Sequence, residues 1–438
     1  MVSASNFVSA DKNALKRSVN GFLPKVALIP LCEEEPSSEI LVKEGDSVKE
    51  GDILAKSRDL FVHSSIPGIV KGIKQCQYGN GKQGLCAFVG LNGAFSFLGK
   101  QLPHQNWTNY DASTIEYLLR EAGIVNTFSK TVPLFKQIRT NGGSVIVVRL
   151  FDDDPSRLTE SFVAKEFLPG VIEGAAILAH AFGAKACVVA YSDSEAFKER
   201  IAEVLAAQSE KRANLFSPGV EIFSVAVDTK KYPCGSMHDI VSAVKKTYKG
   251  EIFSRLGKKD LFVDSMTALN VCRAIAFGMP VMTSFIHATG DCLNSAAMLN
   301  VRIGTTLRDI VLQCGGFKRK LSKIIVNGIV LGHDVSSLDI PVSRGMKSVE
   351  FVPARQVTLH NPANCVRCGN CRKICPVHLW PGNIYRVANL THVDSAGDKN
   401  SAESAFLCTE CGLCNSVCPS RLPLSQTISL LKDSYNEQ

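Results

Sequence analysis

The chain has 438 residues, of which 45% are hydrophobic and 21% are charged, as in globular proteins. This length is too great for one ordinary core and predicts about three domains. The formal net charge of +8 is mild for this size, and it suits an anionic lipid surface, an acidic redox partner or an ordinary solvated surface. No nucleic-acid recognition motif is present and no apolar run reaches the roughly 20 residues of a membrane span. We therefore expect neither nucleic-acid binding nor a membrane span in the chain itself.

Residues 25–100 are expected to form a first domain of short strands. Turns at Gly45 and Gly51 separate the strands, because glycine adopts positive φ without strain. The pattern resembles the barrel-sandwich fold of biotinyl and lipoyl carriers. Those carriers present a modifiable lysine in a defined sequence setting. Lys56 and Lys71 lack that setting, so a swinging-arm role is not favoured.

Residues 105–260 alternate between strand and helix patterns. Three apolar runs are predicted strands: residues 144–148, 186–191 and 221–227. Helical patterns cover residues 162–182 and 237–248. The first run is continuously apolar, as expected for a strand buried on both faces. The alternation predicts a mostly parallel α/β domain.

Residues 278–345 show a mixture of shorter patterns. A helix over residues 306–314 ends at two glycines. Asn327 and Gly328 form a hairpin signal within a strand-like stretch. These features predict a small α+β domain of β-grasp-like architecture.

Residues 356–438 contain two copies of one cysteine spacing. Each copy is C-x2-C-x2-C-x3-C-P, the run by which bacterial ferredoxins bind iron–sulfur clusters. The first run begins at Cys365 and ends at Pro376, and the second begins at Cys408 and ends at Pro419. A single run also fits a zinc knuckle, but two complete runs with both prolines favour 4Fe–4S clusters. We predict a ferredoxin-like helical module with two clusters.

The spacing also predicts which cysteines bind which cluster. In such proteins the fourth cysteine of a run binds the cluster of the other run. The first cluster is therefore assigned to Cys365, Cys368, Cys371 and Cys418. The second cluster is assigned to Cys408, Cys411, Cys414 and Cys375. Two neighbouring clusters suit the passage of electrons better than chemistry at the iron.

The clusters also indicate a compartment. Their assembly needs reducing conditions, and residues 1–24 contain no apolar core of a signal peptide. The other eight cysteines have no metal-binding spacing and are expected to act as small hydrophobic residues. These features predict a cytoplasmic protein.

Three cations lie inside the first run: Arg367, Arg372 and Lys373. Positive charge near a cluster raises its reduction potential and attracts an acidic donor. Ordinary solvated side chains are the alternative. If the first interpretation holds, the partner is a small acidic carrier such as ferredoxin or flavodoxin.

The order of these domains is similar to that of the RnfC family, the C subunits of the Rnf complex, a membrane ferredoxin–NAD oxidoreductase that pumps sodium ions or protons. Residues 231–233, residues 302–309, both cysteine runs and the tail from Cys418 carry the resemblance, together with the glycine turns of the first domain. It covers nearly the whole chain. It implies membrane subunits as partners and a peripheral location on the cytoplasmic face of the cell membrane. Cobalamin-reducing flavoproteins share this layout and are the close alternative.

The resemblance also implies FMN and NADH sites in the α/β domain, but the chain departs from the family there. The family loop G-x-G-G-A-G-F-P-T corresponds to residues 123–133, where only Gly123 and Pro133 remain. Of the family's acidic turn, Asp152 and Asp154 remain. Glycines let backbone amides approach a phosphate or flavin closely. The side chains that replace them make FMN doubtful, with Gly123, Asp152 and Asp154 as the remaining candidates.

Three functions stay open. The favoured one is an electron-transfer subunit that relays electrons through two clusters within a membrane-bound complex. The second is a soluble cobalamin or flavin reductase with its own FMN, and the third is an assembly scaffold. The first is favoured because a chain without a span and without an intact flavin loop needs partners for electron transfer. The isolated chain is accordingly expected not to oxidise NADH.

Overall fold

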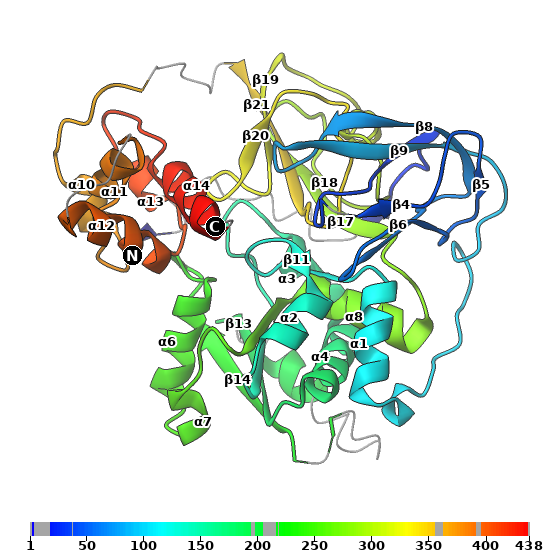
Figure 1. Cartoon of the computed structure of the whole chain (residues 1–438), viewed down its shortest axis with the longest axis horizontal. Coiled ribbons are helices and arrows are strands. Elements are labelled where there is room, and N and C mark those ends of the chain that lie inside the picture. The colour runs from blue at the N-terminus through cyan, green and yellow to red at the C-terminus, as the bar shows by residue number, and fades with distance from the viewer. Residues whose placement is uncertain are drawn as a thin grey trace.

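The computed structural model describes residues 2–3, 18–36, 38–193, 198–204, 216–217, 219–354, 362–390 and 396–436. Figure 1 shows a helical module at one side, formed by the C-terminal residues. A parallel α/β layer lies below, and two β-rich units lie beside each other at the other side. Within the described residues, no helix is long and apolar enough to cross a membrane.

The first β-rich unit is the barrel sandwich. One sheet has the order β3-β9-β8-β5 and the other has the order β4-β6-β7. The strands are β3 (Val26–Pro30), β4 (Glu39–Ile40), β5 (Ser47–Val48), β6 (Ile53–Lys56), β7 (Phe61–His63), β8 (Gly68–Gln77) and β9 (Gln83–Leu91). Gly45 and Gly51 adopt φ of 93° and 92°, so the predicted glycine turns are confirmed.

The α/β unit is built on a four-stranded parallel sheet in the order β14-β13-β12-β16. These strands are β12 (Val145–Arg149), β13 (Ala186–Ser192), β14 (Glu221–Val227) and β16 (Leu261–Asp264). Along β12, Ile146 and Val148 face one core and Val145 and Val147 face the other. Both faces are therefore buried, as the continuous apolar run predicted.

Helices cover both faces of this sheet. The helices α1 (Ala112–Glu121), α4 (Leu168–Phe182) and α8 (Ser265–Phe277) contribute to one core, and α6 (Met237–Thr247) and α7 (Glu251–Ser254) contribute to the other. The single helix predicted over residues 162–182 is two helices, because α3 (Thr159–Glu166) ends before α4 begins. Pro169 lies in the first turn of α4, where proline is well tolerated. The sheet also extends past the predicted boundary at residue 260, since β16 pairs with β12.

The second β-rich unit is a mixed six-stranded sheet in the order β2-β18-β17-β21-β19-β20. Its strands are β2 (Ser18–Asn20), β17 (Thr283–Thr289), β18 (Ala297–Arg302), β19 (Leu321–Val326), β20 (His333–Val335) and β21 (Ser348–Pro353). Helix α9 (Leu307–Gln313) packs into its core. The unit therefore also includes β2, which precedes the predicted range of residues 278–345, and β21, which follows it. Asn327 and Gly328 have φ of 67° and 101° and form the predicted turn between β19 and β20.

The C-terminal module is helical. It contains α10 (Asn370–Ile374), α11 (Pro381–Ala388), α12 (Ala396–Glu403), α13 (Leu413–Ser416) and α14 (Leu424–Asn436). A 3-10 turn, Ser404–Leu407, precedes the second cysteine run. The helices α11 and α14 pack against each other and bring the two runs together.

Candidate iron–sulfur module and the crevice of the parallel sheet

The two cysteine runs have the same backbone conformation. Arg367 and Glu410 occupy equivalent positions and have φ of 52° and 57°. Three further pairs match in the same way. Gly369 and Gly412 have φ of 77° and 69°, His378 and Arg421 have φ of 58° and 52°, and the amides of Arg372 and Asn415 donate to the carbonyls of Gly369 and Gly412. Non-glycine residues with positive φ are uncommon. Their repetition indicates that both runs are wound in the same way.

The second run forms one wall of a small pocket. Cys408, Cys411 and Cys414 line it, and so does Cys375 from the end of the first run. Pro376, Pro381 and Leu413 supply apolar surface around the thiols. Three thiols of one run and the fourth thiol of the other therefore share one space. Four thiolates in apolar surroundings are the donor set of a 4Fe–4S cluster, so these residues fit that group.

The first run is more open. Cys365 and Cys368 are exposed, whereas Cys371 is half-buried. Cys371 and Cys418 pack against the same apolar cluster, which contains Leu422 and Leu424. Cys414 of the second run is part of the same apolar cluster, so this cluster joins thiols of both runs.

The thiols have surroundings that differ from those of a free cysteine. Burial raises the pKa of the Cys408 thiol to about 11, although the amide of Glu410 donates to its Sγ at 3.3 Å and favours the thiolate. The amide of Leu379 makes the same contact, 3.3 Å long, with Sγ of Cys375. Such N–H···S contacts are one means by which a protein adjusts cluster potentials. Within the described part of the chain, no three His, Cys, Asp or Glu side chains converge closely enough to hold a single metal ion. The thiols line a wall instead, as required when each binds a different iron.

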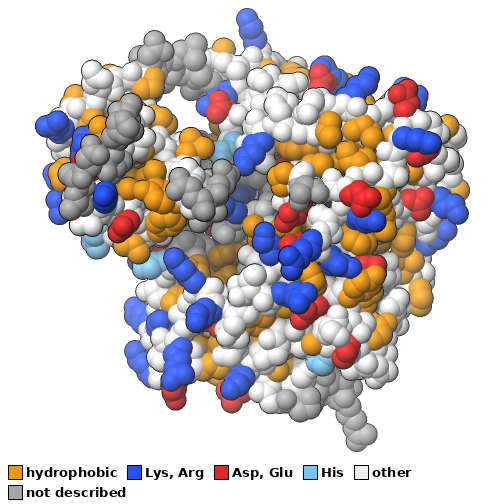
Figure 2. Space-filling model, in the orientation of Figure 1, with side chains coloured by type: hydrophobic (Ala, Val, Ile, Leu, Met, Phe, Trp, Pro, Cys, Tyr) orange, Lys and Arg blue, Asp and Glu red, His pale blue; other side chains and the backbone are white. Residues whose placement is uncertain are grey.

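Positive charge surrounds the first run. Residues 351–393 contain no Asp or Glu. Arg367, Arg372 and Lys373 are exposed, and the Arg372 guanidinium lies over the ring of Trp380 at 5.5 Å. Figure 2 shows Lys and Arg side chains at the outer edge of this module. The three predicted cations are therefore exposed, in the same run as the exposed thiols of Cys365 and Cys368.

The α/β sheet has a topological switch point, and we call the region beyond the carboxyl ends of its two strands the crevice, after the place where such sheets bind ligands. In open parallel sheets ligands bind beyond the carboxyl ends of the strands, where the strand order reverses. That point lies between β12 and β16, because β13 and β14 follow on one side of β12 and β16 lies on the other. Arg149 and Asp264 are the last residues of these two strands. They are both fully buried.

Side chains of the loop over residues 123–133, which lacks most of the family's glycines, fill this crevice. The side-chain amide of Asn126 donates to the backbone carbonyl of Phe262 at 2.7 Å. The Thr127 hydroxyl donates to Asp264 at 2.7 Å. The Phe128 ring lies 4.3 Å from the Arg149 guanidinium, which also donates to the Phe128 carbonyl. All three loop side chains are buried. The positions where the family pattern has glycines thus carry side chains that belong to the core.

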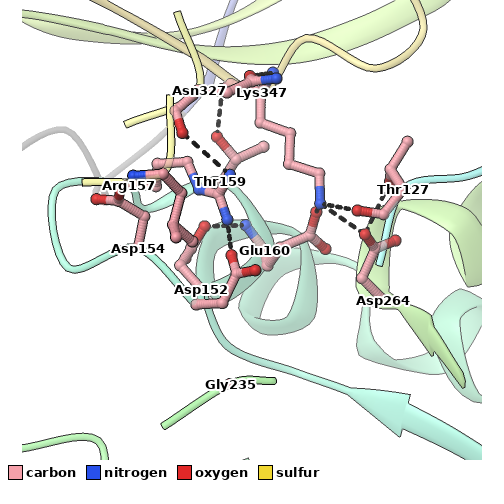
Figure 3. A network of polar contacts seen from close by, with 12 residues as sticks. Thr127, Asp152, Asp154, Arg157, Thr159, Glu160, Gly235, Asp264, Asn327 and Lys347 are labelled. Carbon is pink, nitrogen blue, oxygen red and sulfur yellow. Dashed lines mark hydrogen bonds and ion pairs between the residues drawn. The ribbon is translucent and has the colours of Figure 1, made fainter. Parts of the chain in front are cut away.

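Lys347 completes the filling from the six-stranded sheet. Its Nζ contacts Asp264 at 2.6 Å, Glu160 at 2.9 Å and the carbonyl of Thr127 at 2.7 Å (Figure 3). Burial alone would raise the pKa of Asp264, but the charges of Lys347 and Arg149 hold it well below its usual value. Burial, together with the neighbouring Asp264, raises the pKa of Glu160. The crevice therefore holds a charge network made by the protein itself.

Each of the three predicted cofactor residues has a structural role of its own. A Cβ on Gly123 would lie 2.5 Å from the carbonyl oxygen of Phe61, so this glycine permits close contact with the barrel sandwich. Asp152 accepts hydrogen bonds from the amides of Glu160 and Ser161 at the start of α3. Asp154 is fully buried and binds a loop of the six-stranded sheet. Each residue has a structural partner in a different direction.

Sequence reasoning missed the residues that occupy the crevice: Arg149, Glu160, Asp264 and Lys347. Arg149 and Asp264 each end an apolar strand, and a charged residue directly after such a strand was a usable signal. Nothing in the local sequence marks Lys347, because its partners come from distant parts of the chain.

Two family models match the chain. The RnfC barrel sandwich hybrid domain matches residues 13–93, and the 4Fe-4S dicluster domain matches residues 361–422. The predicted barrel-sandwich domain and the predicted iron–sulfur module are therefore confirmed. The layout between these two domains rests on the structure described above.

Curated relatives cover most of the chain. The C subunit of the Na(+)-translocating ferredoxin:NAD(+) oxidoreductase complex of Acetobacterium woodii is 24% identical over 87% of this chain and 86% of the relative. The C subunit of the proton-translocating complex of Clostridium ljungdahlii is 25% identical over 83% of this chain and 78% of the relative. The C subunit of the ion-translocating oxidoreductase complex of Vibrio cholerae is 24% identical over 84% of this chain, which spans about half (47%) of that relative.

Among solved structures, an NAD+-reducing NiFe hydrogenase in the air-oxidized state is similar with a TM-score of 0.48 at 13% identity. The match covers 76% of this chain and 63% of that chain, and we draw no functional conclusion from it. The domain models and the curated relatives together support membership of the chain in the RnfC family.

Proposed function

We propose that this chain is the electron-transfer subunit of a membrane-bound, ion-translocating ferredoxin:NAD+ oxidoreductase complex, and that it relays single electrons through two 4Fe–4S clusters. One observation carries the proposal: Cys375 lines the same pocket as Cys408, Cys411 and Cys414. A pocket shared between the runs supports interlocked ligands and two adjacent clusters. The clusters supply one-electron carriers, and the chain supplies their ligands, their spacing and their exposure.

The ligand assignment follows the crossed pattern. Cys365, Cys368, Cys371 and Cys418 hold the first cluster, and Cys408, Cys411, Cys414 and Cys375 hold the second. The apolar cluster that Cys371 and Cys418 share also includes Cys414, so it supports close packing of the two runs. Anaerobically purified protein should contain about eight irons and eight sulfides per chain. Stoichiometric zinc without sulfide would contradict the proposal.

Electrons pass between the first cluster and a small acidic carrier, such as ferredoxin or flavodoxin. The exposed thiols of the first run and its exposed cations Arg367, Arg372 and Lys373 support this side as the contact. Complementary charge accelerates association and depends on ionic strength. If the rate of electron transfer to the carrier did not depend on salt concentration, this contact would be contradicted.

The α/β domain binds neither FMN nor NADH in this chain and acts as a scaffold. The buried network of Asp264 and Lys347 and the side chains of the loop occupy the crevice, which supports this interpretation. A reductase with its own FMN is disfavoured for the same reason. One FMN per chain after acid release, together with NADH turnover by the isolated chain, would overturn it.

The chain works at the cytoplasmic face of the cell membrane and attaches through other subunits. The names of the relatives as subunits of ion-translocating complexes support attachment through other subunits. The protein should sediment with membranes from cells that express its partner subunits, and salt or a chaotrope should release it. Recovery entirely in the soluble fraction of such cells would contradict the attachment.

A further inference from the structure

We infer that Tyr232 and Asp154 are positioning residues for the second cluster, although neither is a ligand. They hold the second cysteine run against the α/β unit and the six-stranded sheet. The inference rests on the proposed function, because it concerns the surroundings of a cluster that the chain is proposed to bind. Three contacts carry it.

The first contact is made by the Tyr232 hydroxyl. It donates a hydrogen bond of 2.7 Å to the carbonyl of Cys411, a proposed ligand. The side chain is 1% exposed, in strand β15 (Lys231–Tyr232) of the α/β unit.

The second contact is made by the backbone of Gly412, the residue after Cys411. A Cβ at this position would lie 2.8 Å from the carbonyl oxygen of Val330 and 3.1 Å from its Cγ1. The second run therefore touches the loop between β19 and β20 without space for a side chain. The equivalent residue of the first run, Gly369, has nothing within 4 Å of such a Cβ.

The third contact fixes that loop. Asp154 Oδ2 accepts hydrogen bonds from the amides of Val330 and Leu331 at 2.9 and 2.8 Å. Its Oδ1 accepts from the Ser156 hydroxyl, which in turn accepts from the amide of Ile329. One buried carboxylate thus satisfies the amides of the loop on which Gly412 rests. Its oxygens are occupied by the chain's own donors.

These contacts affect the electronic surroundings of the cluster as well as its position. A donor aimed at the peptide of Cys411 places positive potential near the thiolate and favours the more negative, reduced cluster. Tyr232 and the loop at Val330 also cover the second run from two sides. Substituting these residues, which bind no iron, should therefore change the reduction potential of one cluster.

The hydrogen bond can be removed with Tyr232→Phe in the full chain with both clusters. We expect one of two midpoint potentials, measured by EPR-monitored redox titration, to become more negative while the other stays unchanged. Tyr248→Phe is the matched control, because its hydroxyl also donates to a backbone carbonyl at 2.7 Å, that of Ser224. Unchanged potentials in the Tyr232 variant would overturn the role of this hydroxyl.

The loop can be released with Asp154→Asn, which replaces an acceptor by an amide that repels the loop's own N–H groups. We expect hydrogen exchange at Val330 and Leu331 to accelerate by at least about tenfold, and the second cluster to be lost faster to an iron chelator. The control is Asp152→Asn, which weakens the start of α3 instead. Faster exchange with unchanged cluster loss would overturn the role of Asp154.

The outcomes separate the inference from the proposed function. If the purified chain holds no iron and sulfide, the proposed function fails. If it holds both clusters and neither Tyr232→Phe nor Asp154→Asn changes one of them selectively, the relay stands and the positioning role is wrong.

Discussion

The two cysteine runs share one backbone but lie in different surroundings. In the first run Asn370 is exposed, and Gly369 faces open space. In the second run Leu413 is 1% exposed, and Gly412 packs on Val330. A repeated motif can therefore supply one site that a soluble carrier reaches and another that the rest of the chain encloses. Both clusters have the same ligands and the same chemistry. They differ in role because the first site is exposed and the second is enclosed by the rest of the chain.

The largest expected effect comes from exchanging one interlocking ligand. Cys375→Ala should reduce the iron content from about eight to about four per chain, because the second cluster loses its fourth thiolate. Alkylation followed by mass spectrometry should then modify Cys408, Cys411 and Cys414 and leave Cys365 protected. Cys418→Ala should give the reverse pattern.

The control for these variants is Cys314→Ala, which removes a buried thiol outside the module and should leave the iron content unchanged. If Cys375→Ala instead exposed the thiols of its own run, the ligands would not be crossed.

Reversing the charge of the outer surface should slow electron transfer. The triple variant Arg367→Glu, Arg372→Glu, Lys373→Glu should reduce the rate with an acidic ferredoxin by about 10- to 100-fold at low salt. The difference should shrink as ionic strength rises, since screening weakens exposed charges. Stopped-flow kinetics over a salt series would measure it.

The matched control for charge is a triple reversal on α6 and after it, at Lys245, Lys246 and Lys249. Figure 2 shows Lys and Arg side chains gathered over this region as well. An equal loss of rate in both variants would show that net charge matters and the surface of the first run does not.

The two equivalent glycines should respond unequally to a methyl group. Gly369→Ala and Gly412→Ala both place alanine at positive φ, which costs about 1–2 kcal/mol. Gly412→Ala should cost a further 1–3 kcal/mol or so, because its Cβ collides with Val330. Anaerobic urea unfolding, followed by cluster absorbance, compares the two. Equal losses would mean that the second run does not rest on that loop.

The smallest expected effect is the order in which the clusters are lost. Cys365 and Cys368 are exposed, whereas Cys375 and Cys414 are buried. A chelator should therefore remove the first cluster several times faster than the second. Timed alkylation of the liberated thiols would report the order, and simultaneous loss would make the two surroundings equivalent in practice.

The sequence predicted what depends on local pattern. The apolar run in β12, the glycine turns of the barrel sandwich and the cysteine spacing each led to a feature that the structure or a family model bears out. The sheet continues past the predicted boundary at residue 260, because Leu261–Asp264 is too short to stand out as a strand before it pairs. β2 was missed for the same reason, since three residues gain strand structure only beside β18.

The missing glycines indicated that the crevice was altered, but they could not indicate what fills it. Asn126 and Phe128 could be read from the sequence as obstacles. Arg149, the partner of Phe128, lies in β12, and Lys347, which donates to the Thr127 carbonyl, comes from the six-stranded sheet. Such contacts are set by tertiary packing, which a single sequence does not encode in any local window.

Lys347 also has a consequence for how the chain unfolds. It extends from the six-stranded sheet and satisfies two buried carboxylates of the α/β unit, Glu160 and Asp264. Removing Lys347 from the intact chain would leave these carboxylates buried without their cation, which typically costs about 3–5 kcal/mol, and separating the units would break the same ion pairs. The free energies of the two units are thereby coupled. Calorimetry should register them as one cooperative transition, and Lys347→Met should divide that transition into two.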